Sequence, residues 1–191
     1  MIESFKGKAP KIAESALISE GAHVVGDVEI GEDSTVWPGA VIRADLIGLG
    51  LEEVSMAGPE AAVRPDLGGV RIGGTMKIGS NTHIEDNVVV HFTREIGDNV
   101  VIGHGAVVEA LRIGNNVVIG DNATVLPYVD ISDFCVIAAG ALVPQGMKIP
   151  ERSFVVGMPA QIKELTVKQM ETIETTLSLL AALVKEYRGG G

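Results

Sequence analysis

The stretch that decides the fold runs from Ile84 to Ala110, IEDNVVVHFTREIGDNVVIGHGAVVEA. An aliphatic residue recurs in it at every sixth position, at Ile84, Val90, Ile96, Ile102 and Val108. A period of six is incompatible with the 3.6-residue repeat of an amphipathic α-helix. Hexapeptide repeats are a signature of the parallel β-helix, in which tight corners join short strands and each aliphatic side chain points inward.

The same repeat extends through most of the chain. Six aliphatic residues from Ile12 to Ile42, seven from Ile72 to Val108 and eight from Ile113 to Val155 keep the spacing without exception. These 21 hexads make seven turns at three strands per turn, so the sequence predicts an all-β solenoid, a parallel β-helix of about seven turns. Glycine often follows the aliphatic residue, which suits corners where a Cβ would crowd or φ must be positive.

Two segments depart from the repeat. Residues 46–69 contain two prolines and five glycines, and they indicate an inserted loop that follows Arg43-Ala44-Asp45. From Leu165 onward, apolar residues spaced by three and four predict an amphipathic helix, with Thr166 and Gln169 as a capping box. We therefore predict a β-helix over 1–163, with the loop 46–69, and a C-terminal α-helix with a glycine tail over 164–191.

Composition narrows the function classes. The chain has 191 residues and a formal net charge of −10 without a basic cluster, so neither nucleic acid nor an anionic membrane is an expected partner. No run approaches the ~20 apolar residues of a membrane span, and the first residues lack a signal-peptide pattern, so we expect a cytoplasmic protein. The single cysteine, Cys135, falls on the small-residue phase of the repeat and is expected to be buried.

Three side chains in the deciding stretch can bind a metal ion. His91 and Glu109 each follow an inward aliphatic residue and are 18 residues apart, which is three hexads or one turn. They should therefore lie on the same edge of consecutive turns, about 4.8 Å apart, within reach of one ion. His104 has a different phase and belongs to another edge. A symmetric neighbouring chain could bring it to the other two, which predicts an intersubunit metal site.

Four motifs make the chain resemble the γ-class carbonic anhydrases: VIRAD at 41–45, NTHIEDNVVVH at 81–91, IGHGA at 102–106 and VGMPA at 156–160. The resemblance covers the chain from about residue 10 to the terminal helix. It implies a left-handed β-helix and a homotrimer that binds zinc or iron(II) between subunits through three histidines. Metal-bound hydroxide would then convert carbon dioxide to bicarbonate. His91 and His104 match two of these histidines, and Glu109 stands in place of the third.

The resemblance also implies roles for residues near the metal. Arg43 and Asp45 match an intersubunit arginine–aspartate pair, and Asp86 matches an acid beside the site. Glu85 replaces a glutamine that usually orients metal-bound water, and an ionised carboxylate can only accept hydrogen bonds. Glu109 as a ligand would lower the net charge of the site and raise the pKa of bound water. The glutamates that assist proton transfer in some members are missing, and acids of the 46–69 loop are candidate replacements.

Two other functions share the predicted fold. A hexapeptide-repeat acyltransferase would use His104 as a general base and bind acetyl-coenzyme A between subunits, but His91 and Glu109 would then have no role. A non-catalytic scaffold or ligand-binding protein would explain the missing histidine. Outside these sites we expect His23 and His83 to be exposed, and Trp37 to pack at an interface.

Overall fold

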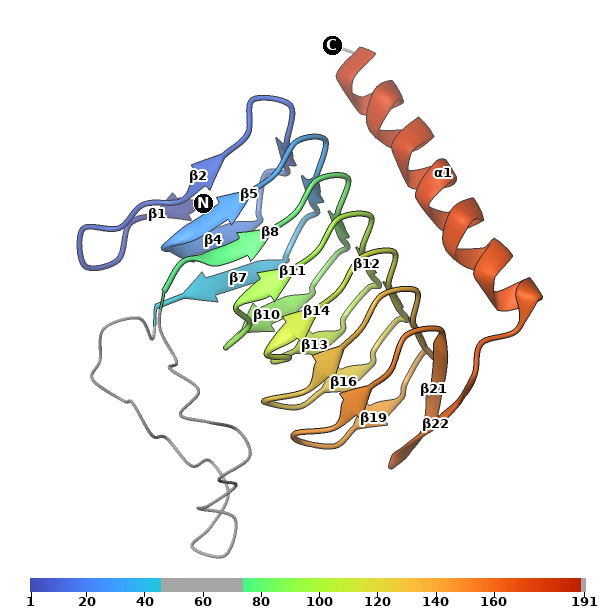
Figure 1. Cartoon of the computed structure of the whole chain (residues 1–191). Helices are drawn as coiled ribbons and strands as arrows, with labels where there is room; N and C mark the ends of the chain where they lie inside the picture. Colours follow the sequence, from blue (N-terminus) through green and yellow to red (C-terminus); the bar gives the residue numbers. More distant parts are fainter. Residues whose placement is uncertain (46–73, 190–191) are drawn as a thin grey trace, which may run out of the picture.

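The computed structural model describes residues 1–45 and 74–189, and it shows a stack of short strands with one long helix beside it (Figure 1). Successive strands along the chain belong to three sheets in rotation, so each turn adds one strand to every sheet. The fold is therefore the predicted parallel β-helix of about seven turns, of the left-handed type. The predicted loop at 46–69 lies outside the described residues.

The strands of each sheet lie one above another along the stack. The first sheet contains β1 (Ile2–Glu3), β4 (His23–Gly26), β7 (Val41–Ala44), β10 (Val89–His91), β13 (Val107–Val108), β16 (Thr124–Val125) and β19 (Leu142–Val143). The second contains β2 (Lys11–Ile12), β5 (Val28–Ile30), β8 (Met76–Ile78), β11 (Glu95–Ile96), β14 (Arg112–Ile113), β17 (Asp130–Ile131) and β20 (Lys148–Ile149). The third contains β3 (Leu17–Ile18), β6 (Thr35–Val36), β9 (His83–Ile84), β12 (Val101–Ile102), β15 (Val118–Ile119), β18 (Val136–Ile137), β21 (Ser153–Gly157) and β22 (Ala160–Glu164). Neighbouring strands pair in parallel, except that β22 folds back antiparallel on β21.

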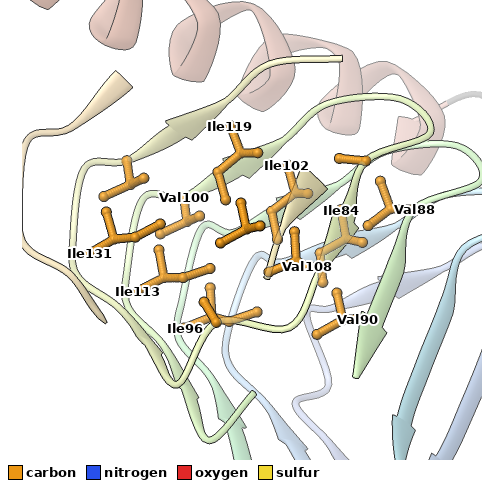
Figure 2. Close-up of a cluster of buried hydrophobic side chains, with 14 of the residues drawn as sticks. Ile84, Val88, Val90, Ile96, Val100, Ile102, Val108, Ile113, Ile119 and Ile131 are labelled. Atoms are coloured by element: carbon orange, nitrogen blue, oxygen red, sulfur yellow. The ribbon is translucent and has the colours of Figure 1, made fainter. Parts of the chain in front are cut away.

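The aliphatic residues of the repeat fill the interior of the stack (Figure 2). Ile102 pairs in register with Ile84 below it and Ile119 above it, and Val90 pairs in the same way with Val108. All five side chains are completely buried. Burying one such side chain contributes roughly 1.5–3 kcal/mol to the free energy of folding. The stacked aliphatic side chains therefore supply most of the stabilising apolar contact.

The corners bring consecutive turns so close together that several of them require glycine. A Cβ on Gly31 would lie 2.7 Å from the carbonyl carbon of Gly79, and one on Gly79 would lie 2.6 Å from that of Gly97. Asparagine serves at corners with a positive φ: Asn81 and Asn99 have φ of 51° and 56°. Asn81 Nδ2 donates a hydrogen bond to Asn99 Oδ1 at 2.7 Å, which links the two turns. Crowding therefore explains the glycines after the aliphatic residues.

The outward side of the second sheet carries a row of alternating charges. From β2 to β20 the strand register aligns Lys11, Glu29, Lys77, Glu95, Arg112, Asp130 and Lys148. Lys11 Nζ lies 2.8 Å from Glu29 Oε1, and Arg112 Nε lies 3.0 Å from Asp130 Oδ1. Each exposed pair contributes little to stability, but the continuous row identifies this side as the one that faces solvent.

The outward side of the third sheet is covered by α1 (Val167–Gly189), which runs along the stack (Figure 1). Val136 in the sheet, Leu165 and Ile173 form a buried cluster, and the residues packed against it are Val118, Phe154, Met170 and Leu177. The predicted capping box is present, because the Thr166 backbone N–H donates to Gln169 Oε1 at 2.9 Å and Gln169 N–H donates to Thr166 Oγ1 at 3.4 Å. No helix in the described residues has the length and hydropathy of a membrane span.

The packing of α1 corrects two expectations about single residues. Trp37 is buried and meets the ring of Tyr187 edge to face, with centroids 5.0 Å apart, so its aromatic partner belongs to its own chain. His83 is fully buried rather than exposed. It stands between Thr35 and Val101 on the outward side of the third sheet, the side along which α1 packs. Thr35 Oγ1 and His83 Nδ1 share a hydrogen bond of 2.9 Å.

Burial of His83 should make the free energy of unfolding depend on pH. Burial lowers the pKa of His83 to about 4, whereas an unfolded chain would titrate it near 6.5. Protons then bind the unfolded state preferentially. The free energy of unfolding therefore has its full value above about pH 6.5 and decreases by up to about 3 kcal/mol as the pH falls toward 4. His83→Val, which repeats the residue found at Val101 in the next strand, should remove this part of the pH dependence in urea unfolding measured between pH 7.5 and 4.5. His23→Val is the matched control and should retain it; identical pH profiles for wild type and His83→Val would contradict the prediction.

Candidate metal centre

His91 and Glu109 lie on one edge of the stack, where the chain leaves the first sheet for the second. His91 ends β10 and Glu109 directly follows β13, and the pairing of Val90 with Val108 places them in consecutive turns. His91 Nδ1 is 3.9 Å from Glu109 Oε1. Two ligands of a tetrahedral zinc ion are about 3.4 Å apart, so a small side-chain adjustment would let both bind one ion.

Arg43 and Asp45 belong to the same edge, one turn before His91. Arg43 pairs with His91 in the strand register, and its Nε and Nη2 donate hydrogen bonds to Asp45 Oδ2 at 3.0 and 2.5 Å. Burial alone would raise the pKa of Asp45, but the hydrogen bonds and charge of Arg43 outweigh it and hold that pKa below its ordinary value. Asp45 Oδ1 is 3.3 Å from His91 Nε2. Both atoms are buried and have no hydrogen-bond partner within residues 1–45 and 74–189.

His104, Glu85 and Asp86 form a second group on a different edge, where the chain passes from the third sheet to the first. Glu85 and Asp86 follow β9, and His104 lies in the equivalent corner one turn later, after β12. His104 Nδ1 is 3.1 Å from Asp86 Oδ2, and His104 Nε2 is 3.7 Å from Glu85 Oε2. One ligand atom from each residue can be chosen so that all three lie within 4.8 Å of one another. Burial raises the pKa of Glu85, although His104 acts in the opposite direction.

The seven residues identified from the sequence therefore fall into two groups. We call them the His91 group (Arg43, Asp45, His91, Glu109) and the His104 group (Glu85, Asp86, His104). His91 and Glu109 lie at the ends of β10 and β13, and the His104 group lies at the opposite ends of these strands, in the same two turns of the stack. Arg43 and Asp45 lie one turn earlier, at the end of β7. Each group has one histidine flanked by carboxylates, and a single chain does not bring the two groups together.

Two further residues support these groups without having been recognised in the sequence. Asp121 Oδ1 accepts a hydrogen bond of 3.0 Å from the His104 backbone N–H, and so fixes the corner that carries the imidazole. Asp121 is 17 residues after His104, in the equivalent corner of the next turn, and that spacing was a usable signal. Phe92 packs its ring at 65° against His91, with centroids 4.3 Å apart. Nothing in the sequence around Phe92 indicated this contact with His91.

The fold and the repeat first define a class of protein. The family described as bacterial transferase hexapeptide (six repeats) matches residues 9–44. A crystal structure of a hexapeptide transferase family protein from Anaplasma phagocytophilum superimposes with a TM-score of 0.79 at 25% sequence identity, and the match covers 98% of each chain. The molecule is thus a hexapeptide-repeat protein.

Curated relatives identify the family within this class. A probable carbonic anhydrase from Methanocaldococcus jannaschii is 37% identical over 85% of this chain and 89% of its own length. The mitochondrial gamma carbonic anhydrase 1 of Arabidopsis thaliana is 30% identical over 94% of this chain, which spans 60% of the plant protein. The chain belongs to the γ-carbonic-anhydrase-like family of hexapeptide-repeat proteins.

The bond from His104 to Asp121 leads to a test with a matched control. Asp121→Ala removes the acceptor that fixes the His104 corner, and should weaken zinc binding by up to roughly tenfold, as the loss of a supporting hydrogen bond does in metal sites. Asp98→Ala removes a similar bond, from the Ser80 N–H at 2.7 Å, at another corner. Both variants should lose about 1 kcal/mol of unfolding free energy, but Asp98→Ala should bind zinc like the wild type. Equal zinc affinity in all three proteins, measured by chelator competition, would contradict the role of Asp121.

Proposed function

We propose that this chain forms a γ-carbonic-anhydrase-like homotrimer that binds zinc or iron(II) between neighbouring subunits and hydrates carbon dioxide to bicarbonate. His91 and Glu109 of one subunit and His104 of the next would bind the ion. Arg43, Asp45, Glu85 and Asp86 would surround it. The membership in the family and the placement of the two groups support this function.

The placement of the two groups is the main support for the proposal. His104 and Glu109 are five residues apart on an extended segment, a distance on the order of 15 Å, so one ion cannot contact both within a chain. His91 and Glu109 occupy the same two turns as the His104 group, and therefore the same height along the stack. A second copy rotated about an axis parallel to the stack keeps that height, so its His104 group can meet the His91 group of the first copy.

The surface between the two groups is suited to contact with another copy. Outward positions of the first sheet carry the aligned side chains of Val41, Val89, Val107, Thr124 and Leu142. Val107 is 37% exposed in the single chain. A mostly apolar strip of this kind marks a protein interface, in contrast to the charged row on the second sheet. A contact between two different edges closes into a ring when the rotation is one third of a turn, which gives a trimer.

The residues present fit a divalent metal ion. Two imidazoles and a carboxylate are an established zinc donor set. The imidazole of His91 has a buried Nε2 without a hydrogen-bond partner in the described part of the chain, and such an unsatisfied group is typical of a functional site. If Nδ1 of His91 binds the ion beside Glu109, its Nε2–H lies 3.3 Å from Asp45 Oδ1, and a small rotation of the ring would form the hydrogen bond that orients it.

The side chains around the ion would each have a different role in the reaction. A bound zinc or iron(II) ion would supply the Lewis acidity that makes water nucleophilic at neutral pH, and Glu109 in place of a third histidine would weaken that acidity. Arg43 neutralises Asp45, and Asp45 orients His91. Asp86, 3.1 Å from Nδ1, orients His104 so that Nε2 can face the neighbouring subunit. Glu85 is the carboxylate nearest His104 Nε2 that can accept a proton or a hydrogen bond.

An acyltransferase is the second candidate, because the superimposed Anaplasma protein is described as a hexapeptide transferase family member. In that function His104, with Asp86 at Nδ1, would act as a general base toward an acceptor bound beside acetyl-coenzyme A. The pairing of His91 with Glu109 would remain unused. A non-catalytic scaffold is the third candidate, and it would bind neither zinc nor acetyl-coenzyme A.

Glu109 provides the direct test of the shared site. The wild type should have a mass of about 60 kDa, three chains of 20.0 kDa, and should contain about one zinc or iron ion per chain. Glu109→Ala should lower zinc affinity at least tenfold, because a ligand is lost, and should keep the circular dichroism of the β-helix. Glu95→Ala, in the exposed charged row, is the control and should bind zinc normally. Unchanged metal content in Glu109→Ala would reject Glu109 as a ligand, and a monomeric zinc-bound wild type would reject a shared site.

Metal removal tests the reaction itself. Stopped-flow hydration of carbon dioxide should fall to the uncatalysed rate after treatment with a chelator and should return when zinc or iron(II) is added. Binding of acetyl-coenzyme A to the metal-free protein, measured by calorimetry, should be absent. Saturable acetyl-coenzyme A binding without metal-dependent hydration would instead establish the acyltransferase.

A further inference from the structure

Glu85 is a buried acid whose surroundings in the single chain leave it unsatisfied. It is 8% exposed, and its Oε1 is buried without a hydrogen-bond partner among the described residues. Its other oxygen lies 3.7 Å from His104 Nε2. Burying a carboxylate without hydrogen-bond partners costs free energy. We therefore expect a positive charge to lie beside Glu85 in the assembled protein.

His104 cannot be that positive charge while it also serves as a metal ligand. Asp86, 3.1 Å from Nδ1, favours the tautomer that carries its proton on Nδ1 and leaves a lone pair on Nε2. Nε2 and Glu85 Oε2 then face each other at 3.7 Å, too far apart for a hydrogen bond. A cation between the two atoms would contact both of them, and about 3.4 Å is the separation expected for two ligands of one tetrahedral zinc ion.

We infer that Glu85 is a fourth protein ligand of the intersubunit metal ion, and this inference rests on the function proposed above. Each ion is then bound by His91 and Glu109 of one subunit and by His104 and Glu85 of the next. Each subunit contributes one imidazole and one carboxylate, held at similar separations of 3.9 and 3.7 Å. Two carboxylates neutralise the divalent charge, which removes the cost of burying Glu85.

Four protein ligands change what the site can do. A zinc ion with four protein ligands is closed, as in structural sites, whereas catalytic sites keep a position for water or substrate. Glu85 would therefore stabilise the trimer and restrict hydration of carbon dioxide, which would require Glu85 to leave the ion or a fifth position to form. Replacing Glu85 by the neutral amide of similar shape should open the site.

The experiment compares wild type, Glu85→Gln and the control Glu95→Gln, an equivalent change in the exposed charged row of the second sheet. Metal-free trimers are titrated with zinc against a chromophoric chelator and with cobalt(II), whose visible absorption reports the number of ligands. Wild type and Glu95→Gln should bind zinc equally and give the intense spectrum of four-coordinate cobalt(II). Glu85→Gln should bind zinc at least about tenfold more weakly, give the weaker spectrum of a site that has admitted water, and hydrate carbon dioxide faster than wild type.

The outcomes separate this inference from the proposed function. A wild type that binds one zinc ion per chain, together with Glu85→Gln of the same affinity and the same cobalt(II) spectrum, would overturn Glu85 as a ligand and leave the shared site standing. A wild type that binds neither zinc nor cobalt(II) would overturn both. Circular dichroism and mass of Glu85→Gln verify that the trimer is assembled, and Glu85→Asp, which keeps the charge on a shorter side chain, should give an intermediate zinc affinity.

Discussion

The inward stacking of aliphatic side chains at a six-residue spacing is the constraint on which the rest of this molecule depends. Each side chain lies over its copy in the next turn, as Ile84, Ile102 and Ile119 do, and a change of one residue in register would turn it away from the core. The stack therefore fixes the height and direction of every other position. His91 lies beneath Glu109, and His104 lies one turn from Glu85, because the core holds the strands that carry them. The geometry of the candidate site is a consequence of packing in the interior.

The same backbone presents three different outer surfaces. The second sheet carries alternating charges, the third is covered by α1, and the first has a mostly apolar strip with an acid-and-histidine group at either end. These surfaces suit solvent, the chain's own helix and another copy of the chain, respectively. A site divided between the two ends of the apolar strip couples assembly to chemistry, since the contact that buries Val107 would also complete the ligand set.

The excess of acid over base at the two edges explains why a cation is central to the proposals. Asp45, Glu85, Asp86 and Glu109 surround two histidines, and Arg43 is the guanidinium that neutralises Asp45. Glu109 and Glu85 stand where a histidine and a glutamine are expected from the resemblance to γ-class carbonic anhydrases. Both differences add negative charge, and the proposed trimer would bring the two carboxylates to one ion. Such a site favours tight binding of a divalent ion over strong activation of water, because each carboxylate reduces the effective charge of the metal.

The sequence by itself determined the β-helix, the capped terminal helix and the alignment of His91 with Glu109, because each depends on spacing along the chain and on local backbone geometry. It assigned His104 to a separate edge for the same reason. Only the tertiary structure decided that His83 is buried, that Trp37 packs on Tyr187 and that His104 lies between Glu85 and Asp86. A repeat fixes the edge and height of a residue, but it carries no information about what covers the outside of a sheet. That depends on contacts between distant segments, such as the packing of Ile173 on Val136, which holds α1 against the stack.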